Sequence, residues 1–152
     1  MEPTGDPVLT AWAADCAEHV LRQFPDFADA AAGAAITAAR GWAAGTATLD
    51  ECRDAALAAH RSARELADSG YRAQADGVRA AGNAAASVDD PTLAETAADY
   101  AIDALGLNSA GCERPTNLAA ERRWQWLRLD EPQRGRLFPE EPPEPGPASC
   151  AI

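Results

Sequence analysis

Short breaks rich in Pro, Gly, Asp and Ser divide the chain into segments with apolar residues at three- and four-residue spacing. Asp6 followed by Pro7 is typical of a helix N-cap and its first helical position. The positions that follow have the spacing of one helical face: Leu9, Trp12, Cys16, Val20 and Phe24. The pattern therefore predicts a first helix that faces a core and ends before Pro25.

The same signals predict four more helices. Asp26 is expected to cap a helix over 27–42, which Gly45 ends. Thr48 with Glu51 forms a capping box and starts a third helix, which ends at Ser69-Gly70. A fourth helix is expected over 71–88. The Asp90-Pro91 pair precedes a fifth helix that carries the apolar positions of 93–105.

The remaining chain predicts one further helix and a tail. A sixth helix is expected from about Thr116 to Leu129, followed by a short helical turn through 137–138. From Pro139 onward, prolines and glutamates dominate, which predicts disorder. No fixed-period repeat is present, so we expect one compact all-α bundle of five to six helices over 1–138, with a disordered tail over 139–152.

Composition supports helix and limits the core. Alanine fills 38 of the 152 positions, and alanine has the highest intrinsic helix propensity. Because large apolar side chains are scarce, a bundle of this composition brings its helices close together. Its stability then depends on the few Trp, Phe, Leu, Ile and Val residues.

The excess of acidic over basic residues indicates which kinds of partner the protein could bind. The net charge is −11, and all 13 basic residues are arginine. A surface this acidic repels phosphate backbones and would suit a basic protein partner, although solubility alone also accounts for it. No signal peptide or membrane-length apolar run is present, so we expect a soluble, cytoplasmic protein with neither nucleic acid nor membrane as partner. The four scattered cysteines are then expected to be reduced thiols, with Cys150 free on the tail.

Two histidines raise the question of metal binding or catalysis. Asp15, Cys16 and His19 are close enough in sequence to approach one another on a helix, but a metal site needs a closing ligand from elsewhere, and Cys16 belongs to the apolar stripe. We therefore predict no metal and no cofactor. If His60 met Asp15 across the bundle, the pair could act as an oriented general base. No nucleophile motif accompanies them, so a structural role for His60 is favoured.

Arginine and aromatic residues supply the candidate binding positions. Trp124 and Trp126, two positions apart, point roughly 200° apart on a helix, so only one can face the core. The other is expected to cover the chain's own C-terminal segment, a dimer mate or a partner, with its own chain favoured. The full candidate binding set consists of Asp15, Arg40, Trp42, His60, Asn83, Tyr100, Trp124 and Gln125.

Five segments resemble a known family: WAADCAEHVL (12–21), AITAARGWAAG (35–45), AALAAH (55–60), VRAAGNAAAS (78–87) and ERRWQWLRL (121–129). Together they are similar to the bacterial putative immunity protein family called immunity-protein-five-like, over about 9–138. The most specific strings are Trp-Ala-Ala-Asp-Cys-Ala-Glu and Glu-x-x-Trp-Gln-x-x-x-Leu. The resemblance implies an all-helical domain that neutralises a co-encoded toxin by binding it, without established catalytic residues.

The sequence also departs from that family. The family's fourth helix tends to read Gly-His, followed a turn later by Thr-Ala-His. Here the corresponding positions are Gly82-Asn83 and Ser87-Val88-Asp89. This departure keeps an alternative open, namely a small helical enzyme or ligand-binding protein in a specialised biosynthetic pathway. Its pocket would be lined by Asp15, His60, Asn83, Tyr100 and Trp124.

Overall fold

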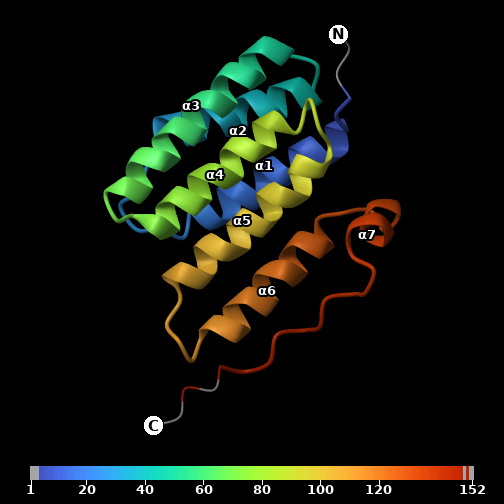
Figure 1. Ribbon diagram of the computed structural model, residues 1–152. Coiled ribbons are helices and arrows are strands. Elements are labelled where there is room, and N and C mark those ends of the chain that lie inside the picture. Colours follow the sequence, from blue (N-terminus) through green and yellow to red (C-terminus); the bar gives the residue numbers. More distant parts are fainter. Residues whose placement is uncertain (1–3, 149, 151–152) are drawn as a thin grey trace.

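The computed structural model describes residues 4–148 and 150, which form seven α-helices and no strand (Figure 1). The helices are α1 (Pro7–Leu21), α2 (Ala30–Ala43), α3 (Leu49–Asp68), α4 (Arg72–Ala86), α5 (Thr92–Asn108), α6 (Arg114–Leu127) and α7 (Glu131–Leu137). The predicted all-α class is confirmed, with seven helices in place of five to six. The short turn expected through 137–138 is the seventh helix.

Helix α4 lies at the centre of the bundle and packs against α1, α2, α3 and α5. Nine of its 15 residues are buried, and apart from Val78 and Asn83 they are all alanine or glycine. Small side chains let the neighbouring helix backbones approach closely, so one helix can contact four others. The larger core side chains come mainly from α1 and the turn after it, where the five predicted apolar positions are all buried.

Capping residues in the sequence predict most helix ends correctly. Asp6 accepts hydrogen bonds from the first turn of α1, and Thr48 with Glu51 forms the predicted capping box of α3. The prediction for Asp26 is wrong, because the side chain of Asp29 caps α2, whereas Asp26 lies in the preceding turn with a φ of 56°. Helix α1 also ends at Leu21, three residues before Phe24, which packs into the core from the turn.

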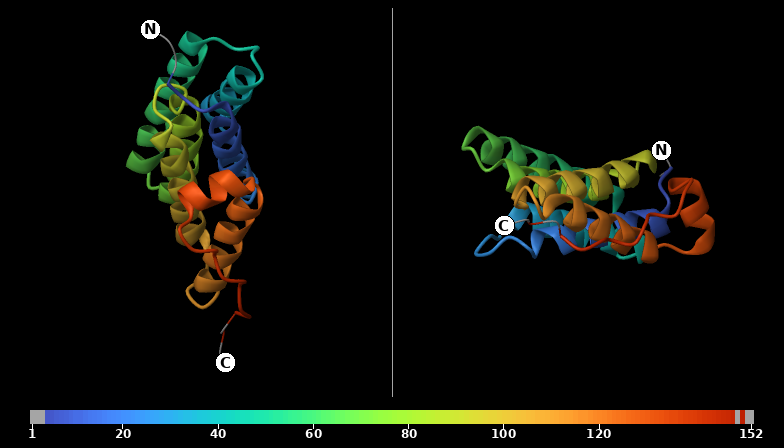
Figure 2. Two further views of the ribbon diagram at one scale, coloured as in Figure 1. Left: turned by 90° about the vertical axis from the view of Figure 1, so that its right-hand side faces the viewer. Right: turned by 90° about the horizontal axis from the view of Figure 1, so that it is seen from below.

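Helices α6 and α7 form an outer layer on the side of the bundle opposite α3 (Figures 1 and 2). The residues that α6 buries are Glu121 and Gln125, and α7 buries Gln133. This layer is therefore attached largely through buried polar groups, unlike the alanine-packed helices α1 to α5. Leu129, in the turn between α6 and α7, is the one residue of this region in the buried hydrophobic core.

The C-terminal segment differs from the disordered tail expected from residue 139. After α7 the described chain doubles back along α6 (Figure 1). Arg123 of α6 donates a 2.8 Å hydrogen bond to the carbonyl oxygen of Pro142, which is buried. A disulfide then joins Cys112, in the turn between α5 and α6, to Cys150. The expectation of reduced thiols is thus wrong for this pair, whereas Cys16 and Cys52 are free and buried.

Candidate binding site

A polar pocket of about 260 Å³ opens between α1, α2 and the C-terminal end of α6. Seven side chains line it, with three guanidiniums and two carboxylates among them: Asp15, Glu18, His19, Arg22, Arg40, Trp124 and Arg128. Asp15, Arg40 and Trp124 belong to the binding set expected from the sequence. The structure brings these three together from three different helices.

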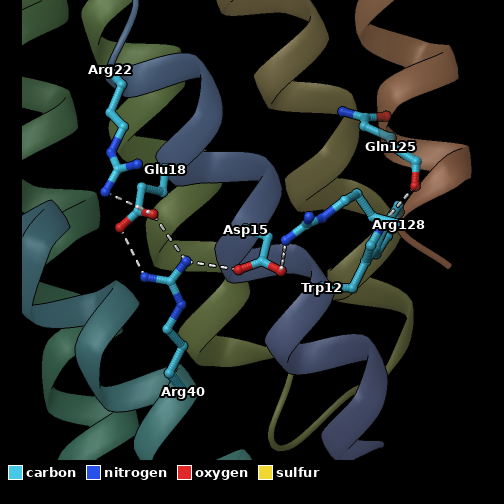
Figure 3. A network of polar contacts seen from close by, with 7 residues as sticks. All are labelled: Trp12, Asp15, Glu18, Arg22, Arg40, Gln125 and Arg128. Carbon is cyan, nitrogen blue, oxygen red and sulfur yellow. Dashed lines mark hydrogen bonds and ion pairs between the residues drawn. The ribbon is translucent and has the colours of Figure 1, made fainter.

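Arg40 stands at the centre of the ion pairs in this pocket (Figure 3). Its guanidinium donates to Oδ1 of Asp15 at 2.7 Å and to Oε2 of Glu18 at 2.8 Å. The fork of donors on a planar guanidinium suits two carboxylates at once. The hydrogen bond from Arg40 is the main reason that the pKa of Glu18 lies below its ordinary value. Arg40 thereby joins α2 to α1.

Both carboxylate oxygens of Asp15 accept hydrogen bonds from arginines. Oδ1 accepts from Arg40, and Oδ2 accepts from Arg128 at 3.4 Å (Figure 3). Arg128 is the C-cap of α6, so Asp15 also connects α1 to the outer layer. Asp15 therefore bridges two arginines that come from α2 and from the end of α6.

Trp124 stacks on His19 across the interface between α6 and α1. The ring centroids are 3.8 Å apart and the planes differ by 2°. Nδ1 of His19 lies 2.8 Å from Oε1 of Glu121, whose side chain is only 3% exposed. The Cζ atom of Arg128 lies 5.3 Å from the Trp124 ring centroid. The aromatic wall is therefore held in place by polar neighbours.

Gln125 is a buried residue of α6 that contacts two core helices. Its side chain is fully buried, and Nε2 donates to the carbonyl oxygen of Ala98 on α5 at 3.0 Å. Its backbone oxygen accepts a 2.8 Å hydrogen bond from Nε1 of Trp12 on α1. Gln125 thus joins α6 to two core helices. Gln125 does not line the polar pocket, and its role in binding stays a prediction.

Trp126 points to the other side of α6, as the spacing of the two tryptophans requires. The Cζ atoms of Arg123 and Arg134 lie 5.4 and 4.2 Å from its ring centroid. Arg134 belongs to α7 and also donates to the backbone oxygen of Trp126. The favoured prediction, that the second tryptophan packs against the chain's own C-terminal part, is confirmed.

His60 lies on α3 and packs against α4. A Cβ atom added at Gly82 would lie 2.9 Å from its Cε1 atom, so the imidazole occupies the space that this glycine leaves. Burial lowers the pKa of His60, and the positive charges of Arg79 and Arg64 lower it further. Among the described residues no hydrogen bond joins His60 to Asp15, whose partners lie on α2 and at the end of α6.

The other expected binding residues lie outside the polar pocket. Asn83 is buried on α4 and donates to the carbonyl oxygen of Arg79 at 2.9 Å. Tyr100 is half-buried on α5, and Trp42 is half-buried near the end of α2. The pocket that holds Asp15 and Trp124 is lined by none of His60, Asn83 and Tyr100.

Several functional candidates were missed at the sequence level. Helical spacing places His19 near Asp15, and the same spacing could have added Glu18 and Arg22, which lie within two turns of Asp15 on α1. Arg128 carried no comparable signal, because its contact with Asp15 spans 113 positions of the sequence. Residues after Pro139 were missed because the segment was expected to be disordered.

Neither a metal-binding cluster nor a membrane-spanning helix is present in the described part of the chain. Over residues 4–148 and 150 there is no group of His, Cys, Asp and Glu side chains that could hold a metal ion. Within the same range no helix is both long and apolar enough to span a bilayer.

Comparison with known proteins gives one family. The model of the family described as Imm-5 like putative immunity protein matches residues 3–132, which extends from before α1 into the start of α7. No curated protein and no solved structure shows significant similarity to the chain. The matched range includes every residue of the polar pocket. The chain therefore belongs to the Imm-5 like putative immunity protein family.

Proposed function

We propose that this protein neutralises a cognate toxin by binding it, without chemical change to either partner. Membership of an immunity protein family supports the general role. The proposal that the protein acts without catalysis rests on the ion pairs of Asp15. Its two carboxylate oxygens both accept hydrogen bonds from arginines. A carboxylate held in this way suits a fixed structural bridge between helices better than a general base.

The charge of the protein favours a basic toxin. With a net charge of −11, the protein attracts a basic partner over several ångströms and accelerates their encounter, an effect that salt weakens. Arginine and tryptophan, which dominate the energetics of many protein interfaces, are present at the surface around α6. The proposed partner is therefore a toxin domain with an excess of arginine and lysine.

The catalytic form of the alternative depends on Asp15 and His60 acting together. Asp15 contacts α2 and the end of α6, whereas His60 packs against Gly82 of α4. A pair that shares no hydrogen bond cannot act as an oriented base, because the acid must hold the imidazole in place. The geometry thus supports the binding role more strongly than the catalytic one.

Co-expression with a growth-inhibiting protein encoded by an adjacent gene tests the proposal. We expect growth to be restored and the two proteins to co-elute as a complex. The variants Asp15→Asn and His60→Gln, checked for folding by circular dichroism, should protect as well as the wild type. Protection lost in a folded His60→Gln variant that still forms the complex would favour catalysis. Failure of the wild type both to restore growth and to form a complex would overturn the proposal.

A further inference from the structure

A second hollow lies on the outer layer, where the C-terminal segment passes α6. It is a groove of about 370 Å³ bordered by α5, α6 and the chain from α7 to Pro143. Leu137 and Phe138 line it and pack against the hydrophobic core, and Pro142 is buried beside them. The groove therefore offers an apolar floor at the surface of an otherwise acidic protein.

Carboxylates surround this apolar floor. Four carboxylates but only one guanidinium line the groove, the carboxylates being Glu95, Asp99, Glu140 and Glu141. The polar pocket on α1 has the opposite balance, with three guanidiniums against two carboxylates. A basic partner is therefore attracted to the groove and not to the polar pocket.

The one arginine of the groove is already engaged. Arg122 donates to Oδ1 of Asp99 and to Oε1 of Gln125, both at 2.9 Å, and its Cζ atom lies 5.8 Å from the Phe138 ring centroid. Arg122 thus neutralises Asp99 only. Glu95 and Glu140 are exposed and make no ion pair with any described residue. These two carboxylates remain available to a partner.

The next turn of α5 carries a further carboxylate. Asp103 follows Asp99 by four positions and lies on the same helical face. Partial burial and the negative charges of Asp76 and Asp99 raise its pKa above the ordinary value. Negative charge on this side of the bundle is therefore in excess over the arginines that could compensate it.

The wall formed by the C-terminal segment is fixed before any partner arrives. Arg123 binds Glu141 at 3.2 Å and the carbonyl oxygen of Pro142 at 2.8 Å. The disulfide between Cys112 and Cys150 ties the far end of the segment to the turn before α6. A surface ordered in advance loses less conformational entropy on binding, which favours affinity.

We propose that this groove is the docking face for the toxin, and that it receives a segment in which arginine or lysine flanks a large apolar side chain. The apolar side chain would contact Leu137 and Phe138, and the basic groups would pair with Glu95 and Glu140. This inference rests on the proposed function and adds the face and the partner chemistry. The argument is charge complementarity combined with an apolar floor, which together fit a basic protein segment.

Charge reversal at the two available carboxylates tests the docking face. The double variant Glu95→Lys/Glu140→Lys is compared with the control Glu65→Lys/Asp68→Lys on α3, on the opposite side of the bundle (Figures 1 and 2). Both variants change the net charge equally, and none of the four residues makes an ion pair with a described residue. Binding to the proposed toxin partner is measured by calorimetry, after circular dichroism has shown that both variants fold.

We expect the groove variant to bind at least tenfold more weakly than the wild type, whereas the control changes by less than about threefold, because close charge pairs contribute far more than long-range attraction. Phe138→Ser should weaken binding through faster dissociation, since it removes the apolar floor. Equal weakening by the groove and control variants would overturn the docking face and leave the proposed function intact. Absence of any complex with the wild type would overturn both.

Discussion

Nε1 of Trp12 donates a hydrogen bond of 2.8 Å to the backbone oxygen of Gln125, 113 positions later in the chain. Both residues are buried, and the bond joins the first helix to α6. Because α6 buries mainly polar side chains, this contact and the one between Gln125 and Ala98 determine where the outer layer sits. Trp124 and Arg122 then occupy their places in the polar pocket and the acidic groove.

Replacement of Trp12 by Phe tests this attachment. The variant loses the indole donor and part of a buried ring, which should lower the free energy of unfolding by about 1–3 kcal/mol. Trp42→Phe is the control, because Trp42 is half-buried and its indole makes no hydrogen bond to a described residue. Urea unfolding measures both. Equal losses in the two variants would show that the bond to Gln125 contributes little.

Removal of the disulfide tests the anchoring of the C-terminal segment. A cross-link between residues 38 positions apart restricts the unfolded chain by about 4 kcal/mol in the loop-entropy account, so Cys112→Ser/Cys150→Ser should unfold at markedly lower urea. A reductant should destabilise the wild type and leave the double variant unchanged.

Thiol alkylation followed by intact-mass measurement provides an independent check of the same bond. We expect no modification of the native protein, because Cys16 and Cys52 are fully buried. Mild reduction should expose two thiols, at Cys112 and Cys150. Two modified cysteines before any reductant is added would contradict the disulfide.

Alanine substitutions at two glycines should change the stability of the fold in opposite directions. Gly82→Ala places a Cβ atom 2.9 Å from the His60 ring and should destabilise the fold by about 1–3 kcal/mol through overpacking. Gly33→Ala on α2 meets nothing within 4 Å and should stabilise the fold by roughly 0.5–1 kcal/mol through helix propensity. Thermal unfolding of both variants compares them directly. A stabilising Gly82→Ala would mean that His60 does not occupy that space.

His60 should make stability depend on pH. Burial, Arg79 and Arg64 lower its pKa in the folded state from 6.5, so the unfolded chain binds the proton more readily. The resulting stability is present above the unfolded pKa and is lost as the pH falls below it. Between about pH 8 and 5, His60→Gln should therefore flatten the decline in unfolding free energy. A resonance assigned to His60 by its absence from His60→Gln that titrates above 6.5 would contradict this environment.

Helices were predictable because their signals are local. Each helix start is signalled by residues close together in the sequence, as by Asp6 with Pro7 and by Thr48 with Glu51. The spacing of apolar residues on α1 likewise identifies its buried face. The prediction of Asp26 as the cap of α2 rested on its place directly after Pro25, and it did not consider Asp29. Only the turn geometry, with a positive φ at Asp26, distinguishes Asp29 as the cap.

The site was only partly predictable, because its contacts join distant helices. Nothing near Asp15 in the sequence indicates that Arg40 and Arg128 bind it, and nothing near His60 indicates that it faces Gly82. The C-terminal segment has a composition that cannot form a core of its own. It is ordered by partners outside itself, Arg123 and Cys112, which composition does not show.

Titration of the purified protein into the proposed toxin partner, with the toxin's activity as readout, tests the central claim most directly. A protein that acts by binding should abolish activity linearly up to about one equivalent, without change in the mass of either chain, because each molecule masks one partner. Full inactivation by a small fraction of an equivalent, or a change in the toxin's mass, would show turnover and contradict the account.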